Sequence, residues 1–261
     1  MITSIQNPKI QQVRELLAHS RARREQGAYV IEGIRLLEEA WQAGIQPSGV
    51  FFSADLNPRG MVLVEEMRLA GFVTEEVEFS LLKRVSDTEH SQGLLAVLPY
   101  RAVDLPLNAN FCLILDAIRD PGNMGTILRT ACAAGVQSVH LSSDCADIFS
   151  PKVLRSAMGA HFHLPIATKS WGEIQEYLNH SPEPPAIFLS DVREGQSLWQ
   201  CSFTEPTALI ISNEGAGASD EARTLTTHVV HIPMPGGFES LNASIAAAIL
   251  LFEVVRQRAN P

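Results

Sequence analysis

The chain alternates between short unbroken apolar runs and longer segments in which apolar residues recur every three or four positions. Unbroken runs of about four to eight apolar residues are typical of strands buried on both faces of a parallel sheet. The longer segments are typical of helices that pack one apolar face on such a sheet. The repetition of the two patterns along most of the chain predicts an α/β protein.

The first part of the chain, residues 1–101, is predicted to form a small α/β domain. Its expected helices cover 8–24, 32–43 and 58–70, and its expected strands cover 28–31, 50–53 and 94–98. Residues 102–110 (AVDLPLNAN) contain a proline and two asparagines and show little periodicity, which predicts a linker.

The second part, residues 111–261, is predicted to form a larger domain, because strand, turn and helix signals repeat there with little interruption. Its expected strands cover 111–115, 138–141, 186–189, 208–211 and 229–232, and a long terminal helix is expected over 241–258. Helical segments between buried strands favour a parallel sheet covered on both faces. Ligands of such sheets bind at the carboxyl ends of the strands, so functional residues are expected in the turns that follow them.

Charge is distributed unevenly along the chain. The formal net charge of −9 argues against a protein whose whole surface binds nucleic acid electrostatically. Within residues 1–24, however, a single acid, Glu15, stands against the basic residues Lys9, Arg14, Arg21, Arg23 and Arg24. Such a stretch fits either a solvated helix face or one place of phosphate contact, and charge alone favours the solvated face.

Neither a membrane segment nor a metal site is expected. The start of the chain lacks the basic and apolar regions of a secretory signal. The longest wholly apolar run, 245–252, is far too short to span a bilayer. The four cysteines are scattered and include no CxxC pair, which predicts reduced thiols, a cytoplasmic location and no structural zinc.

The segment DAIRDPGNMGTILRTACAA, which follows the first strand of the larger domain, combines a helix start with glycines inside the helix. Asp120 and Pro121 supply a capping side chain and a φ that is preset for the first helical position. Gly122, Gly125 and Arg129 then fall at i, i+3 and i+7 of the helix. Each such glycine costs roughly 1 kcal/mol relative to alanine, which favours close approach of a ligand or a partner backbone. The arginine on this face is therefore a candidate functional residue, with an ordinary surface arginine as the simpler alternative.

The segment LIISNEGAGAS at 209–219 is a buried strand that runs into a glycine-rich turn. Successive backbone amides in such a turn can form a small nest that faces a ligand, and the glycines permit positive φ. Taken alone, the pattern fits a tight turn between a strand and a helix equally well.

The segment HIPMPGGFESLNAS at 231–244 contains a strand end, a Pro-Gly-Gly loop and the start of the terminal helix. Ser240 is expected to cap this helix, with Asn242 in its first turn. A loop of this kind beside exposed amides at a helix start can hold a polar ligand largely by backbone contacts.

Taken together, the three segments resemble the three motifs of the SpoU/TrmH family of RNA methyltransferases. The first matches DPxNxGxxxRT, the second resembles GxEGxG and the third matches IPMxGxxxSLNxS, in the order and spacing of the family. SIQNPKI near the start and YVIEGIRLLEEA at 29–40 resemble the substrate-binding extension of the family. The chain departs from the motifs at three positions. Ser212 and Asn213 stand where the second motif more often has glycine and a small residue, and Ala243 stands where the third motif usually has valine.

The resemblance implies an enzyme that uses S-adenosylmethionine to methylate a ribose 2′-hydroxyl in structured RNA, with ribosomal RNA favoured over tRNA. It implies an α/β trefoil-knot (SPOUT) domain with a parallel sheet, preceded by a small α/β RNA substrate-binding domain. It also implies a homodimer whose active site borrows residues across the interface.

The resemblance also implies roles for individual residues. The expected catalytic residues are Arg129, Asn123, Glu214, Ser240 and Asn242. The methyl donor is expected to be held around Ser212, Asn213, Gly215, Ile232, Met234 and Leu241. The candidates for RNA phosphate contact are Arg21, Arg23 and Arg24 in the N-terminal domain.

Two roles are open for Arg129. The family proposal is that this arginine removes the hydroxyl proton, but a guanidinium has a pKa of about 12 or more and no acceptor until it is deprotonated. The alternative is that Arg129 grips the adjacent phosphate and stabilises the alkoxide as it forms.

Three other functions are alternatives. The first is methylation of a different target, either tRNA or ribosomal RNA whose methylation confers antibiotic resistance, and the second is a non-catalytic RNA-binding or assembly factor that keeps the fold. The presence of both Arg129 and Asn242 argues against the second. The third is a nucleotide-binding, dehydrogenase-like protein, and it lacks the GxGxxG fingerprint and the acidic residue expected downstream.

Overall fold

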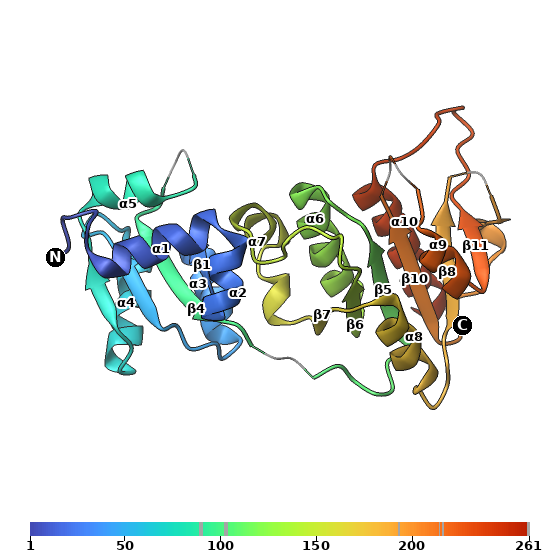
Figure 1. Cartoon of the computed structure of the whole chain (residues 1–261), viewed down its shortest axis with the longest axis horizontal. Coiled ribbons are helices and arrows are strands. Elements are labelled where there is room, and N and C mark those ends of the chain that lie inside the picture. The colour runs from blue at the N-terminus through green and yellow to red at the C-terminus, as the bar shows by residue number, and fades with distance from the viewer. Residues whose placement is uncertain (89–90, 102–103, 193, 214, 216, 260–261) are drawn as a thin grey trace. The chain divides into compact units, whose positions relative to one another are not determined.

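A computed structural model describes residues 1–261 except 89–90, 102–103, 193, 214, 216 and 260–261. Backbone contacts divide the chain into two compact units, and Figure 1 shows the order of their elements. The first unit is Met1–Ala102 together with Asp147–Phe162, and the second is Val103–Ala146 together with His163–Pro261. The predicted boundaries (1–101, 102–110 and 111–261) placed residues 147–162 in the larger domain, whereas their contacts lie in the first unit.

The first unit is a four-stranded sheet of order β1-β4-β2-β3, in which β4 runs antiparallel to both of its neighbours. Its strands are β1 (Ala28–Glu32), β2 (Gly49–Phe52), β3 (Thr74–Glu76) and β4 (Leu94–Pro99). Its helices are α1 (Pro8–Ala18), α2 (Ser20–Gln26), α3 (Ile34–Gln42), α4 (Pro58–Leu69), α5 (Phe79–Val85) and α7 (Pro151–Ala157), with a 3-10 turn η1 (Ala160–Phe162). Apolar residues of α1 and α5 cover one face, and those of α3 and α4, joined by Leu154 of α7, cover the other.

The helical character predicted for 8–24 is confirmed, but it is divided between two helices, α1 and α2. The helix breaks at His19, whose backbone is extended (φ −125°, ψ 119°), and α2 ends at Gly27 in the left-handed region. The break places the Arg23 guanidinium against the last turn of α1, where it donates to the carbonyls of Leu16 (2.6 Å) and Leu17 (3.2 Å). These carbonyls have no partner further along their own helix, so the arginine satisfies groups that a helix end leaves open.

The second unit is a seven-stranded sheet of order β7-β6-β5-β10-β8-β11-β9, and every described pairing in it is parallel. Its strands are β5 (Phe111–Asp116), β6 (Ser138–Leu141), β7 (Ile166–Thr168), β8 (Ala186–Asp191), β9 (Gln196–Ser197), β10 (Thr207–Ser212) and β11 (His228–His231). Its helices are α6 (Pro121–Ala133), α8 (Trp171–Asn179), α9 (Asp220–Leu225) and α10 (Ala243–Ala259), with a 3-10 turn η2 (Leu198–Gln200). The predicted parallel sheet is thus confirmed, with two short strands, β7 and β9, that the sequence pattern did not reveal.

Helices pack on this sheet, and the carboxyl ends of its strands form the edge at which ligands are expected. Side chains of α8 and α9 pack on apolar residues of β5, β8 and β10, while α10 contacts β10 and packs along α6. Because the strands are parallel, the carboxyl ends of β5, β8, β10 and β11 meet at the same edge, where the turns of interest begin. Among the described helices, none is long and apolar enough to cross a membrane.

Candidate functional site

A cavity that is open to solvent lies where β8, β10 and β11 end. Five of the residues predicted to hold a cofactor line it, namely Ser212, Asn213, Ile232, Met234 and Leu241. Ser240, predicted as catalytic, lines it as well, whereas Gly215 is not among its lining residues. The second and third sequence segments, far apart in the chain, therefore meet in one pocket, because their strands both lie beside β8 in the sheet.

Ser212 offers the pocket an unused hydroxyl. Its Oγ atom is buried and has no hydrogen-bond partner in the described structure. A buried hydroxyl without a partner costs about 1–3 kcal/mol, which a polar ligand atom in the pocket would recover. The apolar side chains of Ile232, Met234 and Leu241 complete a wall suited to a ligand with both polar and apolar parts.

The Asn213 side chain holds the glycine-rich turn against the end of β5. Its Nδ2 donates to the carbonyl of Ala117 (3.1 Å), and its Oδ1 accepts from the backbone amide of Gly215 (2.8 Å). The buried carboxylate of Asp116 accepts from the amide of Ser219 (2.8 Å) at the far end of the turn. The amide of Asn213 is thus occupied by backbone groups. The predicted catalytic residue Glu214 lies outside the described residues.

The end of β8 supplies pocket residues that sequence reasoning missed. Ser190, Asp191 and Val192 line the cavity beside the two predicted turns. The Asp191 carboxylate accepts from the amide of Glu194 (3.1 Å) and lies 3.5 Å from a guanidinium nitrogen of Arg223. The signal that could have found these residues is their place directly after a buried parallel strand. The sequence after this strand lacks the glycine pattern of the other two segments, so it gives a weaker signal.

The terminal helix begins later than predicted, and Asn242 is its cap. Helix α10 starts at Ala243, and the Oδ1 atom of Asn242 accepts from the amide (3.0 Å) and the hydroxyl (2.6 Å) of Ser244. The carbonyl of Asn242 accepts from the amides of Ile245 and Ala246. The prediction that Ser240 caps this helix is therefore wrong. Asparagine is among the best capping residues, and it stands two positions nearer the helix.

The same Asn242 side chain ties α10 to α6. Its Nδ2 donates to the Oδ1 atom of Asn123 (2.9 Å), and this assignment of the amide is forced because its Oδ1 already accepts from a backbone amide. Asn123 lies in the first turn of α6, which begins at Pro121 after the cap Asp120. The Asp120 Oδ1 atom accepts from the amide of Asn123 (2.8 Å), and a Cβ at Gly122 would lie 2.9 Å from that oxygen. The glycine thus leaves room for the cap.

Arg129 lies further along the same helix. It is exposed, and within the described residues it forms no hydrogen bond or ion pair. Its guanidinium is therefore available to an anionic ligand.

The three arginines predicted to contact RNA phosphate differ in their surroundings. Arg21 is exposed and pairs with Glu25 (2.6 Å), and Arg24 is exposed with no ion pair or hydrogen bond to the described part of the chain. Arg23, in contrast, is 4% exposed, and its guanidinium donates to Asp147 and to two backbone carbonyls. A guanidinium that is buried and bonded inside the protein is poorly placed to reach a phosphate, which argues against the phosphate-contact prediction for Arg23.

The described residues contain no group of three or more His, Cys, Asp or Glu side chains arranged to hold a metal ion. The four cysteines are all free.

Comparisons with known proteins show the family to which this chain is related. A family model described as the SpoU rRNA Methylase family matches residues 110–252, and one described as an MRM3-like substrate binding domain matches residues 7–96. The chain is 35% identical to an "Uncharacterized tRNA/rRNA methyltransferase" of Synechocystis, covering 98% of this chain and 94% of that protein. It is 31% identical to the 23S rRNA (guanosine(2553)-2′-O)-methyltransferase of Bacillus subtilis, covering 97% and 98%.

Solved structures show the same relationship. The SpoU methyltransferase AviRb from Streptomyces viridochromogenes, solved with AdoMet, superposes with a TM-score of 0.87 at 30% identity, covering 98% of this chain and all of that chain. An AdoMet-bound rRNA methyltransferase from Sinorhizobium meliloti gives a TM-score of 0.86 at 26% identity, covering 98% and 97%. The predicted fold class, a parallel-sheet SPOUT domain after a small α/β domain, is confirmed by these matches.

The two hydrogen-bonding roles of Asn242 can be separated by mutation. Asn242→Ala removes both the cap and the tie to α6, so we expect it to lower the free energy of unfolding by about 1–2 kcal/mol. Asn123→Ala removes the tie and leaves the Asn242 cap in place, so it should cost less, about 0.5–1 kcal/mol. Urea unfolding of both variants measures the difference. An Asn123→Ala variant as unstable as Asn242→Ala would contradict the capping role.

Proposed function

The chain belongs to the SpoU rRNA methylase family, and we propose that it transfers the methyl group of S-adenosylmethionine to a ribose 2′-hydroxyl of ribosomal RNA. The observation that carries this proposal is the pocket at the carboxyl edge of the parallel sheet, with Arg129 on the helix that Asn242 ties to its rim. Relatives named as ribosomal RNA 2′-O-methyltransferases match almost the whole chain and support ribosomal RNA as the substrate.

The residues that line the pocket fit S-adenosylmethionine. The unpartnered Ser212 hydroxyl can bond a polar atom of the donor, and Ile232, Met234 and Leu241 can pack on its apolar parts. Two neighbouring structures were solved with this molecule. When bound, S-adenosylmethionine supplies an electrophilic methyl group on a sulfonium centre. Asn213 and Gly215 contribute by keeping the adjoining turn in shape.

Arg129 is the proposed catalytic residue. In the proposed reaction, the ribose 2′-oxygen would form a bond to the methyl carbon while the carbon–sulfur bond breaks with its electron pair left on sulfur, and the hydroxyl proton would pass to water. Since an alkoxide-like oxygen reacts with a cationic donor, alignment and stabilisation of the developing negative charge carry most of the catalysis. The exposed guanidinium suits this second task, by binding the neighbouring phosphate and the oxygen together. A role as base would need a neutral guanidine, so we favour charge stabilisation.

Asn123, Asn242 and Ser240 are proposed to arrange the site. The bond between the two asparagines fixes the start of α6 against the start of α10, and Ser240 lines the pocket one residue before Leu241. Glu214 stays a candidate on the strength of the motif. Arg21 and Arg24, exposed on α2, stay candidates for RNA phosphate contact. A cytoplasmic location, where the four free cysteines would remain reduced, completes the proposal.

The test of the function is methylation of ribosomal RNA with labelled S-adenosylmethionine, using RNA from a strain that lacks the gene. We expect label in an alkali-resistant dinucleotide, since a 2′-O-methyl group blocks cleavage at that linkage. Arg129→Ala should lower kcat by about 10²–10³-fold while the donor Kd changes less than about twofold, because the arginine acts on the transition state. Arg129→Lys keeps a cation and should retain part of the rate.

Other outcomes would select other functions. Label only in tRNA would favour a tRNA methyltransferase of the same family. No label in either RNA, combined with no binding of S-adenosylmethionine, would favour a non-catalytic RNA-binding factor. Alkali-sensitive label would place the methyl group on a base and remove the ribose assignment.

We also propose that the protein is a homodimer that pairs through α10. Ile245 (50% exposed) and Phe252 (48% exposed) are seven residues apart on this helix, and so lie two turns apart on one side of it. An exposed apolar side of a long helix is typical of subunit interfaces. The family resemblance points to the same pairing.

The dimer is tested by light scattering after gel filtration. We expect the measured mass of the native protein to be twice the chain mass of 28.5 kDa. The measured mass of an Ile245→Glu/Phe252→Glu variant should be that of a monomer, because buried charges without partners oppose association. Leu69→Glu, which changes an 80% exposed leucine on α4, should leave the mass unchanged. A native chain that elutes as a monomer would refute the pairing.

A further inference from the structure

Residues Asp147–Phe162, called the strap from here on, belong to the first unit although they come between two strands of the second. The strap follows β6 and precedes β7 in the chain. Leu154 of the strap is part of the apolar core of the first unit. The Phe149 ring stacks on Tyr100 with ring centres 4.4 Å apart and lies 4.5 Å from Tyr29. These contacts make the strap a structural part of the N-terminal unit.

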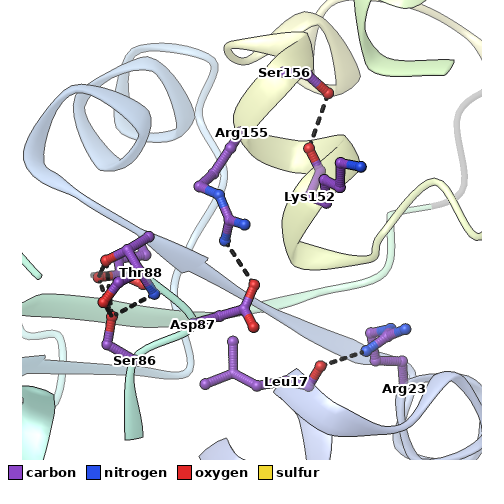
Figure 2. Close-up of polar contacts among 9 residues, drawn as sticks. Leu17, Arg23, Ser86, Asp87, Thr88, Lys152, Arg155 and Ser156 are labelled. Atoms are coloured by element: carbon purple, nitrogen blue, oxygen red, sulfur yellow. Dashed lines mark hydrogen bonds and ion pairs between the residues drawn. The ribbon is translucent and has the colours of Figure 1, made fainter. Parts of the chain in front are cut away.

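Two ion pairs fasten the strap. The buried Arg23 guanidinium donates twice to the Oδ2 atom of Asp147, from Nε at 2.9 Å and from Nη2 at 2.6 Å. The Arg155 Nη1 atom lies 3.0 Å from the Oδ2 atom of Asp87, and Figure 2 shows this contact beside the bond from Arg23 to the Leu17 carbonyl. The first pair is the less exposed of the two, with side-chain exposures of 5% for Arg23 and 28% for Asp147, so removing one member leaves a poorly solvated charge without its partner.

The residues just before the strap are bonded to the end of β5 and to the loop between β5 and α6. The amide of Ala146 donates to the carbonyl of Ile118 (2.9 Å), and the Cys145 thiol donates to the carbonyl of Leu115 (3.2 Å). Ile118 stands two residues before Asp120, the cap of α6. A short series of bonded residues thus leads from Arg23 through the start of the strap to the helix that carries Arg129.

We propose that the strap couples the RNA-binding unit to the start of α6, and that Arg23 is a positioning residue for methyl transfer to RNA. The inference rests on the proposed function. RNA held by the N-terminal unit must present its 2′-hydroxyl to Arg129 within about an ångström of the reactive geometry. With the strap released, RNA bound to the first unit would be linked less tightly to the start of α6, and its effective concentration at the active site would fall.

The key variant is Arg23→Met, which keeps the length and apolar stem of the side chain and removes its charge. We expect kcat/KM for ribosomal RNA to fall about tenfold or more, mostly through KM, with the Kd for S-adenosylmethionine within about twofold of native. Hydrogen exchange in residues 147–162 should rise as the strap is released. Arg59→Met, which breaks an exposed pair with Glu38 in the same unit, is the matched control and should match the native enzyme in all three measurements.

A double variant, Arg23→Met/Asp147→Leu, separates positioning from direct RNA contact. Replacing both charges by apolar side chains removes the unpaired carboxylate, so we expect the strap to dock again and most of the RNA activity to return. If Arg23 instead bound phosphate, the double variant would stay as inactive as Arg23→Met. If Arg23→Met fails to fold, Arg155→Ala can replace it. This variant removes the more exposed ion pair with Asp87, and we expect a smaller decrease in kcat/KM for ribosomal RNA.

Two results would overturn the inference. One is a native kcat/KM for RNA in Arg23→Met. The other is a double variant whose strap is docked by hydrogen exchange but whose RNA activity is not restored. Failure of the proposed function would look different, because the native protein would then methylate no RNA while the exchange of the strap still responded to the variants.

Discussion

The arrangement of the candidate site depends on the hydrogen bonds of the Asn242 side-chain amide. Its oxygen starts the terminal helix by accepting from Ser244, and its nitrogen holds Asn123 at the start of α6. Reversing the amide would leave a backbone donor facing a donor, so one side chain fixes both helices in one arrangement. The pocket wall at Ser240 and Leu241 lies just before this residue, and Arg129 extends from the helix that it holds.

Function in RNA chemistry does not require a basic protein. With a net charge of −9, the chain offers RNA a few placed cations instead of a general positive field. Arg129 and Arg24 are exposed and form no ion pair in the described structure. Arg23 lies between the exposed Arg21 and Arg24 in the sequence, but its side chain is buried and bonds Asp147. Selective use of arginines in this way lets most of the surface repel nonspecific RNA while the site attracts it.

Much of the architecture was predictable, because it rests on local patterns. Buried strands such as β5 and β10 are nearly unbroken apolar runs. The glycine-rich segments after β10 and β11 predicted where the pocket lies. The features that escaped prediction depend on partners distant in sequence. Arg23, just after the break at His19, bonds Asp147, 124 residues away, which no local pattern reveals. The Asn242 cap is likewise bonded to Asn123, 119 residues away. Short edge strands such as β9 carry too few residues for a pattern.

The central claim, that the carboxyl edge of the sheet presents a methyl group to Arg129, is tested most directly by a crystal structure with S-adenosylmethionine bound. The account predicts a donor in the cavity lined by Ser212, Ile232, Met234 and Leu241, with the Ser212 hydroxyl bonded to it. Its methyl group should face the α6 surface that carries Arg129. A donor bound elsewhere, or a methyl group turned away from that helix, would contradict the account.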